Sequence, residues 1–183
     1  MAQLTVFCGP MMAGKTLSLI RAYESADPRT RLAIKPSIDT RYSSAWIVSH
    51  NGIGIPAESL DNLQNVESLV GDRTAIFIDE GQFFMDLSER CASLLRAGKS
   101  VWVSGLNATA QQRPWASMSE ILAMADDIVH LKVDRCQMCH KFPGSHTVTR
   151  ASRLDPTMST MTIKIGGGDE YLAVCRGCLD KRP

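Results

Sequence analysis

The sequence LTVFCGPMMAGKT, from Leu4 to Thr16, decides the fold because it joins a strand, a glycine-rich turn and a helix. Residues 4–8 are rich in β-forming side chains, and apolar residues recur at helical spacing over 15–24. Between these elements the chain matches the pattern G-x-x-x-x-G-K-[ST] in full. Glycines in such a loop let backbone N–H groups point at phosphate oxygens, at the positive end of the helix. We therefore expect a nucleoside triphosphate to bind here.

Two side chains of this loop have distinct expected roles. The ammonium group of Lys15 would reach the β- and γ-phosphates, and the hydroxyl of Thr16 would bind Mg²⁺. The alternative is a glycine-rich turn that carries Lys and Thr by chance. The flanking strand and helix favour the phosphate site, since both elements stand where that site needs them.

The stretch AIFIDE, from Ala75 to Glu80, supplies two acids after a second strand. Its continuous apolar run is typical of a strand buried on both faces of a parallel sheet. Asp79 emerges at the carboxyl end of this strand, where ligands bind in open α/β sheets. We expect Asp79 to hold Mg²⁺ through water and Glu80 to act as general base on an attacking hydroxyl. Alternatively, the two acids could cap the helix that follows.

The other periodic segments complete an alternation of strands and helices. Strands are expected at 32–35, 46–48, 101–103 and 128–131, and helices at 87–96 and 118–125. This alternation predicts an α/β fold with a parallel sheet, of the RecA-like P-loop NTPase type. The composition changes near residue 133 to a chain rich in Cys, Gly and Thr. We therefore predict a nucleotide-binding domain over 1–133 and a small zinc-binding domain over 134–183.

Four of the six cysteines form two C-x-x-C pairs, namely Cys136, Cys139, Cys175 and Cys178. Two thiolates at this spacing can occupy adjacent corners of a tetrahedron, and two pairs close the shell around one ion. A closed shell predicts a structural Zn²⁺ rather than a catalytic one. The alternatives are two disulfides, which a cytosolic setting disfavours, or chance pairs of buried thiols. Cys8 and Cys91 lie in apolar stretches and are expected in the core.

The overall composition excludes several classes of protein. A chain of 183 residues with 44% hydrophobic and 21% charged residues is not disordered in bulk. No apolar run approaches the roughly 20 residues of a membrane helix, and the N-terminal sequence lacks a secretory pattern. A net charge of +1 gives no electrostatic basis for a dedicated nucleic-acid or membrane binder. We expect a cytoplasmic protein with neither of these partners.

Several motifs together resemble the type II thymidine kinase family, in the order of that family and across nearly the whole chain. They are GPMMAGKT at 9–16, DTRYSS at 39–44, DEGQFF at 79–84, IGG at 165–167, Tyr171 and CRGC at 175–178. The resemblance implies ATP-dependent phosphorylation of the 5′-hydroxyl of thymidine or deoxyuridine. It also implies a homotetramer, with Glu80 as the general base and the segment 142–164 as a lasso that closes over the base.

The resemblance further implies the residues of both binding sites. The ATP site would consist of Gly9, Pro10, Met12, Ala13, Gly14, Lys15, Thr16, Arg41, Asp79 and Gln82. The nucleoside site would consist of Met11, Phe83, Leu106, Trp115, Thr147, Val148, Thr162, Ile163, Ile165, Gly166 and Tyr171. Within it, Phe83 would pack on the pyrimidine and Tyr171 would lie near the deoxyribose.

The chain departs from the family pattern over Leu106–Ala110. Relatives carry an aromatic residue where this chain has Ala110, and Asn107 replaces a frequent aspartate. Either the base pocket is looser, or Trp115 at a nearby family phenylalanine position compensates.

A second hypothesis is a P-loop ATPase whose zinc ribbon binds single-stranded nucleic acid. The near-zero net charge disfavours this hypothesis.

Overall fold

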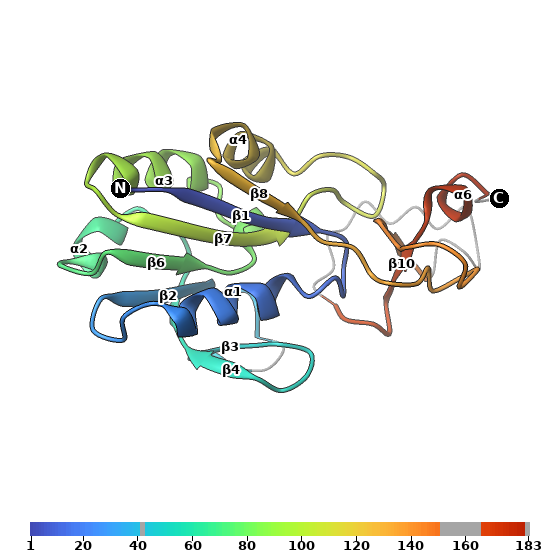
Figure 1. Cartoon of the computed structure of the whole chain (residues 1–183), viewed down its shortest axis with the longest axis horizontal. Coiled ribbons are helices and arrows are strands. Elements are labelled where there is room, and N and C mark those ends of the chain that lie inside the picture. The colour runs from blue at the N-terminus through green and yellow to red at the C-terminus, as the bar shows by residue number, and fades with distance from the viewer. Residues whose placement is uncertain (41–42, 151–165, 182–183) are drawn as a thin grey trace.

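The computed structural model describes residues 1–40, 43–150 and 166–181, and its central feature is a parallel sheet (Figure 1). All pairings in this sheet are parallel, and the strand order is β5-β2-β6-β7-β1-β8. The strands are β1 (Leu4–Gly9), β2 (Arg31–Pro36), β5 (Glu58–Leu60), β6 (Ala75–Ile78), β7 (Ser100–Leu106) and β8 (Asp127–His130). Because the strands are parallel, the loops that follow their carboxyl ends gather at one edge of the sheet.

Both faces of the sheet are covered (Figure 1). One face carries α1 (Lys15–Ser25) and the hairpin of β3 (Trp46–Val48) and β4 (Gly54–Pro56); the other carries α2 (Val66–Val70), α3 (Leu87–Arg96) and α4 (Ala116–Met124). Under α1, Phe77 stacks on Trp102 with ring centroids 4.6 Å apart and meets Tyr23 edge-on at 5.3 Å. Burying a phenylalanine side chain contributes about 1.5–3 kcal/mol. This packing fixes α1, and therefore its first residue, Lys15, against the sheet.

The C-terminal part lies beyond the carboxyl edge of the sheet (Figure 1). It contains β9 (His146–Thr149), β10 (Tyr171–Val174) and the short helix α6 (Arg176–Leu179), with β9 and β10 antiparallel. Val148, Leu172, Val174 and Leu179 form a small apolar cluster with the paired cysteines. The predicted lasso, 142–164, includes β9, and its part from 151 onward lies outside the described residues.

The predicted α/β fold with a parallel sheet and a cysteine-bearing C-terminal part is confirmed. The strand at 46–48 and the helix at 87–96 have their expected bounds. Cys8 and Cys91 are buried in the main core, as predicted. The sequence analysis missed β4, β5, α2, β9, β10, α6 and the 3-10 turn η1 (Gly81–Phe83). Within the described ranges, no helix combines the length and apolar character that a membrane crossing requires.

Candidate active site and metal centre

The Gly9–Thr16 loop curls tightly between β1 and α1. Gly9, Met12 and Gly14 have φ values of +150°, +62° and +82°, so half of positions 9–14 lie in conformations that L residues rarely adopt. A Cβ atom on Gly9 would lie 2.4 Å from the carbonyl oxygen of Leu131. Glycine is therefore required at position 9, since any side chain would collide with the backbone that follows β8.

Lys15 is almost buried and turns back onto its own loop. Its Nζ donates to the carbonyl oxygen of Pro10 at 2.6 Å. Thr16 follows directly, and its hydroxyl lies 3.2 and 3.3 Å from the two carboxylate oxygens of Asp79. The loop and the acid after β6 thus meet at the carboxyl edge, as the sequence predicts.

Asp79 has a second buried partner that the sequence analysis missed. The hydroxyl of Ser104, near the end of β7, donates to Asp79 Oδ1. Strands β6 and β7 are neighbours, with Ile78 in register with Val103, so Asp79 and Ser104 follow at matching positions. A polar residue near the end of the apolar run VWVSGL was the available signal. Ser104 and Thr16 together hold the carboxylate in one orientation.

Glu80 stands next to Asp79 in a strained backbone conformation. Its φ and ψ are +50° and +44°, a left-handed geometry that is uncommon for a residue other than glycine and that often marks functional sites. Its side chain is 8% exposed, and its Oε2 accepts a hydrogen bond from Gln82 Nε2 at 2.5 Å. Gln82 Oε1 accepts in turn from the backbone N–H of Leu106 at 3.0 Å. Gln82 therefore connects Glu80 to the end of β7.

A cavity of about 210 Å³ opens between these groups. The Gly9–Thr16 loop, the two acids after β6, the end of β2, the β3–β4 hairpin and the glycines before β10 surround it. The lining residues are Met11, Met12, Gly14, Lys15, Thr16, Leu17, Lys35, Asp39, Ile47, Val48, Ser49, His50, Asn51, Asp79, Glu80, Gly167 and Gly168. Of the predicted ATP-site residues, Met12, Gly14, Lys15, Thr16 and Asp79 therefore line the same cavity as Glu80, whereas Gly9, Pro10, Ala13 and Gln82 are not among its lining residues.

The predicted base-binding residues Phe83, Leu106 and Trp115 lie around the carboxyl end of β7. The rings of Phe83 and Trp115 meet edge-on with centroids 5.9 Å apart. The indole Nε1 of Trp115 is buried, and no described residue accepts a hydrogen bond from it. Trp115 thus provides the aromatic surface next to Phe83, on the loop where Ala110 has none.

The C-terminal part is attached to this edge through β9. Thr147 Oγ1 accepts a hydrogen bond from the backbone N–H of Met11 at 2.9 Å. The Thr147 carbonyl accepts another from Gln112 Nε2, also at 2.9 Å, and Gln112 has a left-handed φ of +62°. Val148 instead points into the apolar cluster around the cysteines. Of these two predicted nucleoside-site residues, Thr147 is therefore the one that reaches the Gly9–Thr16 loop.

The remaining predicted residues divide into two groups. Tyr171 begins β10 opposite Thr149, and Gly166 lies shortly before that strand. Arg41, Thr162, Ile163 and Ile165 lie outside the described residues.

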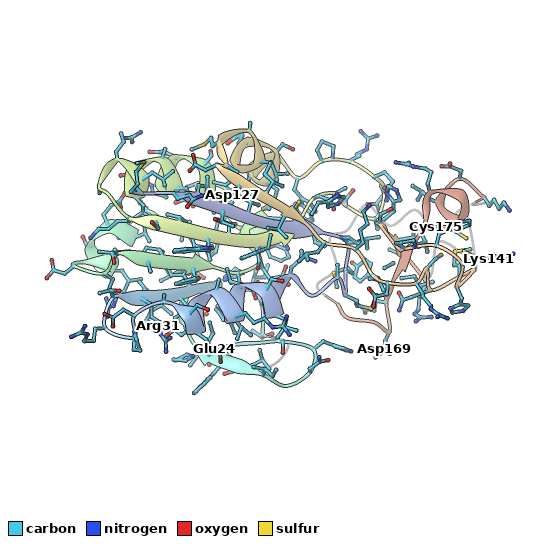
Figure 2. All side chains as sticks on the ribbon, viewed as in Figure 1. Glu24, Arg31, Asp127, Lys141, Asp169 and Cys175 are labelled. Carbon is cyan, nitrogen blue, oxygen red and sulfur yellow. The ribbon has the colours of Figure 1, made fainter. Side chains whose placement is uncertain are left out.

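The four paired cysteines converge in the C-terminal part, where Figure 2 labels Cys175. Their ligand atoms all lie within 4.8 Å of one another, and the Sγ atoms of Cys139 and Cys175 are 3.7 Å apart. Four thiolates around Zn²⁺, each at about 2.3 Å, would be separated by about 3.8 Å. The donor set and its spacing therefore fit a zinc ion.

The surroundings of Cys136 favour a thiolate. Burial raises the pKa of this thiol, but hydrogen bonds from the backbone N–H groups of Cys139, Cys175 and Met138 outweigh burial and lower the pKa to about 6. Cys91 is the opposite case, because burial and the nearby Asp86 carboxylate raise its pKa to about 12. Within the cluster Cys178 differs from Cys136, because burial and hydrogen bonds with the neighbouring thiols raise its pKa to about 12. The fit to a metal ion therefore rests on the positions of the four sulfur atoms, whereas Cys91 is an inert core thiol.

Comparison with known proteins gives a consistent result. The sequence model of the family described as thymidine kinase matches residues 2–179. The thymidine kinase of rabbit fibroma virus is 32% identical over 173 residues, which cover 93% of this chain and 92% of the viral protein. The cytosolic thymidine kinase of Gallus gallus is 32% identical over 185 residues, which cover 99% of this chain and 79% of the relative. The thymidine kinase of Pseudothermotoga lettingae is 31% identical over 187 residues, which cover 98% of this chain and 95% of the relative. The chain therefore belongs to the thymidine kinase family and is a nucleoside kinase.

Proposed function

We propose that the chain transfers the γ-phosphoryl group of ATP to the 5′-hydroxyl of thymidine or deoxyuridine. The observation that carries this proposal is the position of Glu80 on the cavity wall, with Lys15 and Asp79 lining the same cavity. A carboxylate there can accept the proton of the hydroxyl while Lys15 faces the donor phosphates. Phosphoryl transfer requires this positioning and charge neutralisation more than covalent chemistry.

In this proposal Gln82 positions the general base, Glu80, and does not itself bind the nucleotide. Its amide donates to Glu80 and accepts from Leu106, so both ends of the amide are fixed. Glu80 is thereby held in one rotamer, with its carboxylate toward the cavity. Because Glu80 is held in a reactive geometry before the substrate binds, the entropic cost of the transfer is lower.

Asp79 and Thr16 have the oxygen ligands that Mg²⁺ prefers. The Thr16 hydroxyl oxygen lies 3.2 Å from Asp79 Oδ1 and 3.3 Å from Asp79 Oδ2, so both residues can reach one ion. When bound with ATP, the ion would neutralise charge that develops on the β- and γ-phosphate oxygens. We propose that Thr16 binds it directly and Asp79 through water. Ser104 keeps the Asp79 carboxylate from rotating away.

The nucleoside would bind on the β7 side of the cavity. Phe83 would pack on the pyrimidine, with Met11, Leu106 and Trp115 around it. Thr147, through its contact with Met11, would bring β9 to the base edge, and Tyr171 would lie near the deoxyribose. A base read by fixed polar groups is strongly discriminated, because a mismatched base leaves buried groups unpaired.

A nucleoside panel with ATP and Mg²⁺ tests this proposal. We expect 5′-monophosphates from thymidine and deoxyuridine, and a much lower kcat/KM, by about 10²-fold or more, for deoxycytidine, deoxyadenosine and deoxyguanosine. Phosphate analysis of the products is the measurement. ATP hydrolysis that single-stranded nucleic acid stimulates, without any nucleoside product, would instead support the ATPase hypothesis.

Removal of the Ser104 hydroxyl should weaken magnesium use. In Ser104→Ala, Asp79 loses a buried hydrogen bond of about 1 kcal/mol, and its carboxylate is less well oriented. We expect about a three- to tenfold lower kcat/KM for ATP and a half-saturating Mg²⁺ concentration shifted upward. Ser119→Ala, which removes a hydroxyl bonded to the Trp115 carbonyl on α4, is the control. An unchanged Mg²⁺ titration in Ser104→Ala would contradict the positioning role.

We further propose that the cysteine cluster holds a structural Zn²⁺ and that the enzyme is a cytoplasmic homotetramer. The spacing of the four sulfur donors supports the zinc. The similarity to the cytosolic thymidine kinase of Gallus gallus supports the location. The family resemblance of the motifs supports the tetramer.

A further inference from the structure

Lys35 is a buried cation near the end of β2 that the mechanism above does not use. Its side chain is 3% exposed, and its Nζ donates to the carbonyl oxygens of Ser43 at 2.6 Å and Trp46 at 3.3 Å. An ammonium group has three N–H donors, so two acceptors leave one donor available. Among the residues with described positions, no carboxylate lies within ion-pairing distance of it.

The sheet register places Lys35 beside the acids of the site. Ile34 in β2 is in register with Ile78 in β6, and the backbone N–H of Asp79 donates to the Ile34 carbonyl. Lys35 directly follows Ile34, and Asp79 directly follows Ile78, so the two residues occupy matching positions on neighbouring parallel strands. Both line the cavity of about 210 Å³. Lys15 lines the same cavity from the loop after β1, so two buried lysines border one space.

A buried ammonium whose direct partners are neutral carbonyl oxygens is electrostatically costly, because no described carboxylate forms a contact ion pair that would offset its desolvation. A polyanion in the cavity would provide that charge, and attraction is strong where water is excluded. The three acids of the cavity, Asp39, Asp79 and Glu80, would otherwise repel a polyphosphate.

We propose that Lys35 is a second phosphate-binding cation of the site. Two of its N–H groups bind the carbonyl oxygens of Ser43 and Trp46, and its positive charge attracts the polyphosphate of the bound nucleotide. This inference rests on the proposed ATP-dependent function and adds a binding residue to it. The expected ligand class is a nucleoside di- or triphosphate, since the charge of a monophosphate is smaller.

Calorimetric titration of AMP, ADP and ATP with Mg²⁺ into Lys35→Met tests the proposal without nucleoside. We expect the loss of affinity to grow with the number of phosphates, from threefold or less for AMP to about tenfold or more for ATP. Lys35→Gln, which keeps an amide donor for the loop carbonyls without the charge, should show the same gradient. Arg31→Met is the matched control, because it removes a β2 cation that lies over the Tyr23 ring near Glu24, away from the cavity (Figure 2).

Three outcomes would overturn the proposal: unchanged affinities in Lys35→Met, an equal loss for all three nucleotides, or a gradient in Arg31→Met as large as in Lys35→Met. An equal loss would mean that Lys35 only shapes the 43–46 segment. If the variants do not fold, the ¹⁵Nζ resonance of Lys35 in the unmodified protein decides, because it should shift with ADP and not with adenosine. Nucleotide binding with this gradient but no thymidine phosphorylation would contradict the proposed function and leave the role of Lys35 supported.

Discussion

Glu80→Gln is expected to lower kcat for thymidine phosphorylation by about 10²- to 10⁴-fold while ATP binding survives. The substitution keeps the size of the side chain and an oxygen that can accept from Gln82, so the geometry of this segment persists. An amide cannot accept the proton of the 5′-hydroxyl at neutral pH. The loss therefore falls on the chemical step, and the KM values for thymidine and ATP should change little.

Steady-state kinetics of Glu80→Gln, with ATP affinity from calorimetry, provide the measurement. Glu24→Gln is a matched control, since Glu24 is an exposed acid near the end of α1 and far from the C-terminal part (Figure 2). A near-normal kcat in Glu80→Gln would show that another group takes the proton. If Glu80→Gln lost both ATP affinity and kcat, Glu80 would instead act through the phosphate site.

Removal of zinc is expected to abolish activity through the C-terminal part. Its own apolar cluster is small, and Cys136, Cys175 and Cys178 are three of its seven buried members, whereas a structural zinc contributes about 10–16 kcal/mol to a folded site. Without the ion, β9 and β10 lose their fixed ends, and Thr147 no longer stays against Met11. We expect Cys178→Ser to be isolated with little zinc, reduced β structure and at least about 10²-fold lower kcat/KM for thymidine.

Metal analysis, circular dichroism and kinetics of Cys178→Ser test this expectation together. Cys91→Ala is the matched control, because it removes a buried thiol of α3 that takes no part in the cluster, and the variant should retain full zinc content. Reduced, fully active protein that contains no zinc would contradict the zinc assignment. Zinc-free protein with a native β9–β10 hairpin but low activity would contradict the structural role alone.

The parts of the fold that sequence reasoning recovered have strong local signals. The run AIFI in β6 is buried throughout, and the glycine-rich loop lies between a strand and a helix, so neither needed tertiary context. The short strands β4 and β5 have three residues each, and β9 and β10 have four. Their pairing partners decide their conformation, and periodicity over so few residues carries little information.

The same limit applies to the candidate site. Glu80, Asp79 and Lys15 belong to motifs, whereas Ser104 and Lys35 come to the site only through the register of adjacent strands. Each is a polar residue at the carboxyl end of an apolar strand, and that signal becomes specific only once strand order is known. Gln112 gave no local signal, because its left-handed φ and its bond to Thr147 depend on a strand 35 residues away.

The central place of β1 also determines when the enzyme can become competent during its synthesis. Strand β1 lies between β7 and β8: Leu4 pairs with Val101 and Thr5 with Asp127, so both partners of β1 are made long after it, and the N–H of Leu131 donates to the Cys8 carbonyl. Such non-local pairing is slow, and incomplete sheets expose edges that aggregate. The Gly9–Thr16 loop therefore acquires its final neighbours only after Thr147 of β9, which contacts Met11, has been made. A truncated nascent chain can carry the nucleotide motif without a working site.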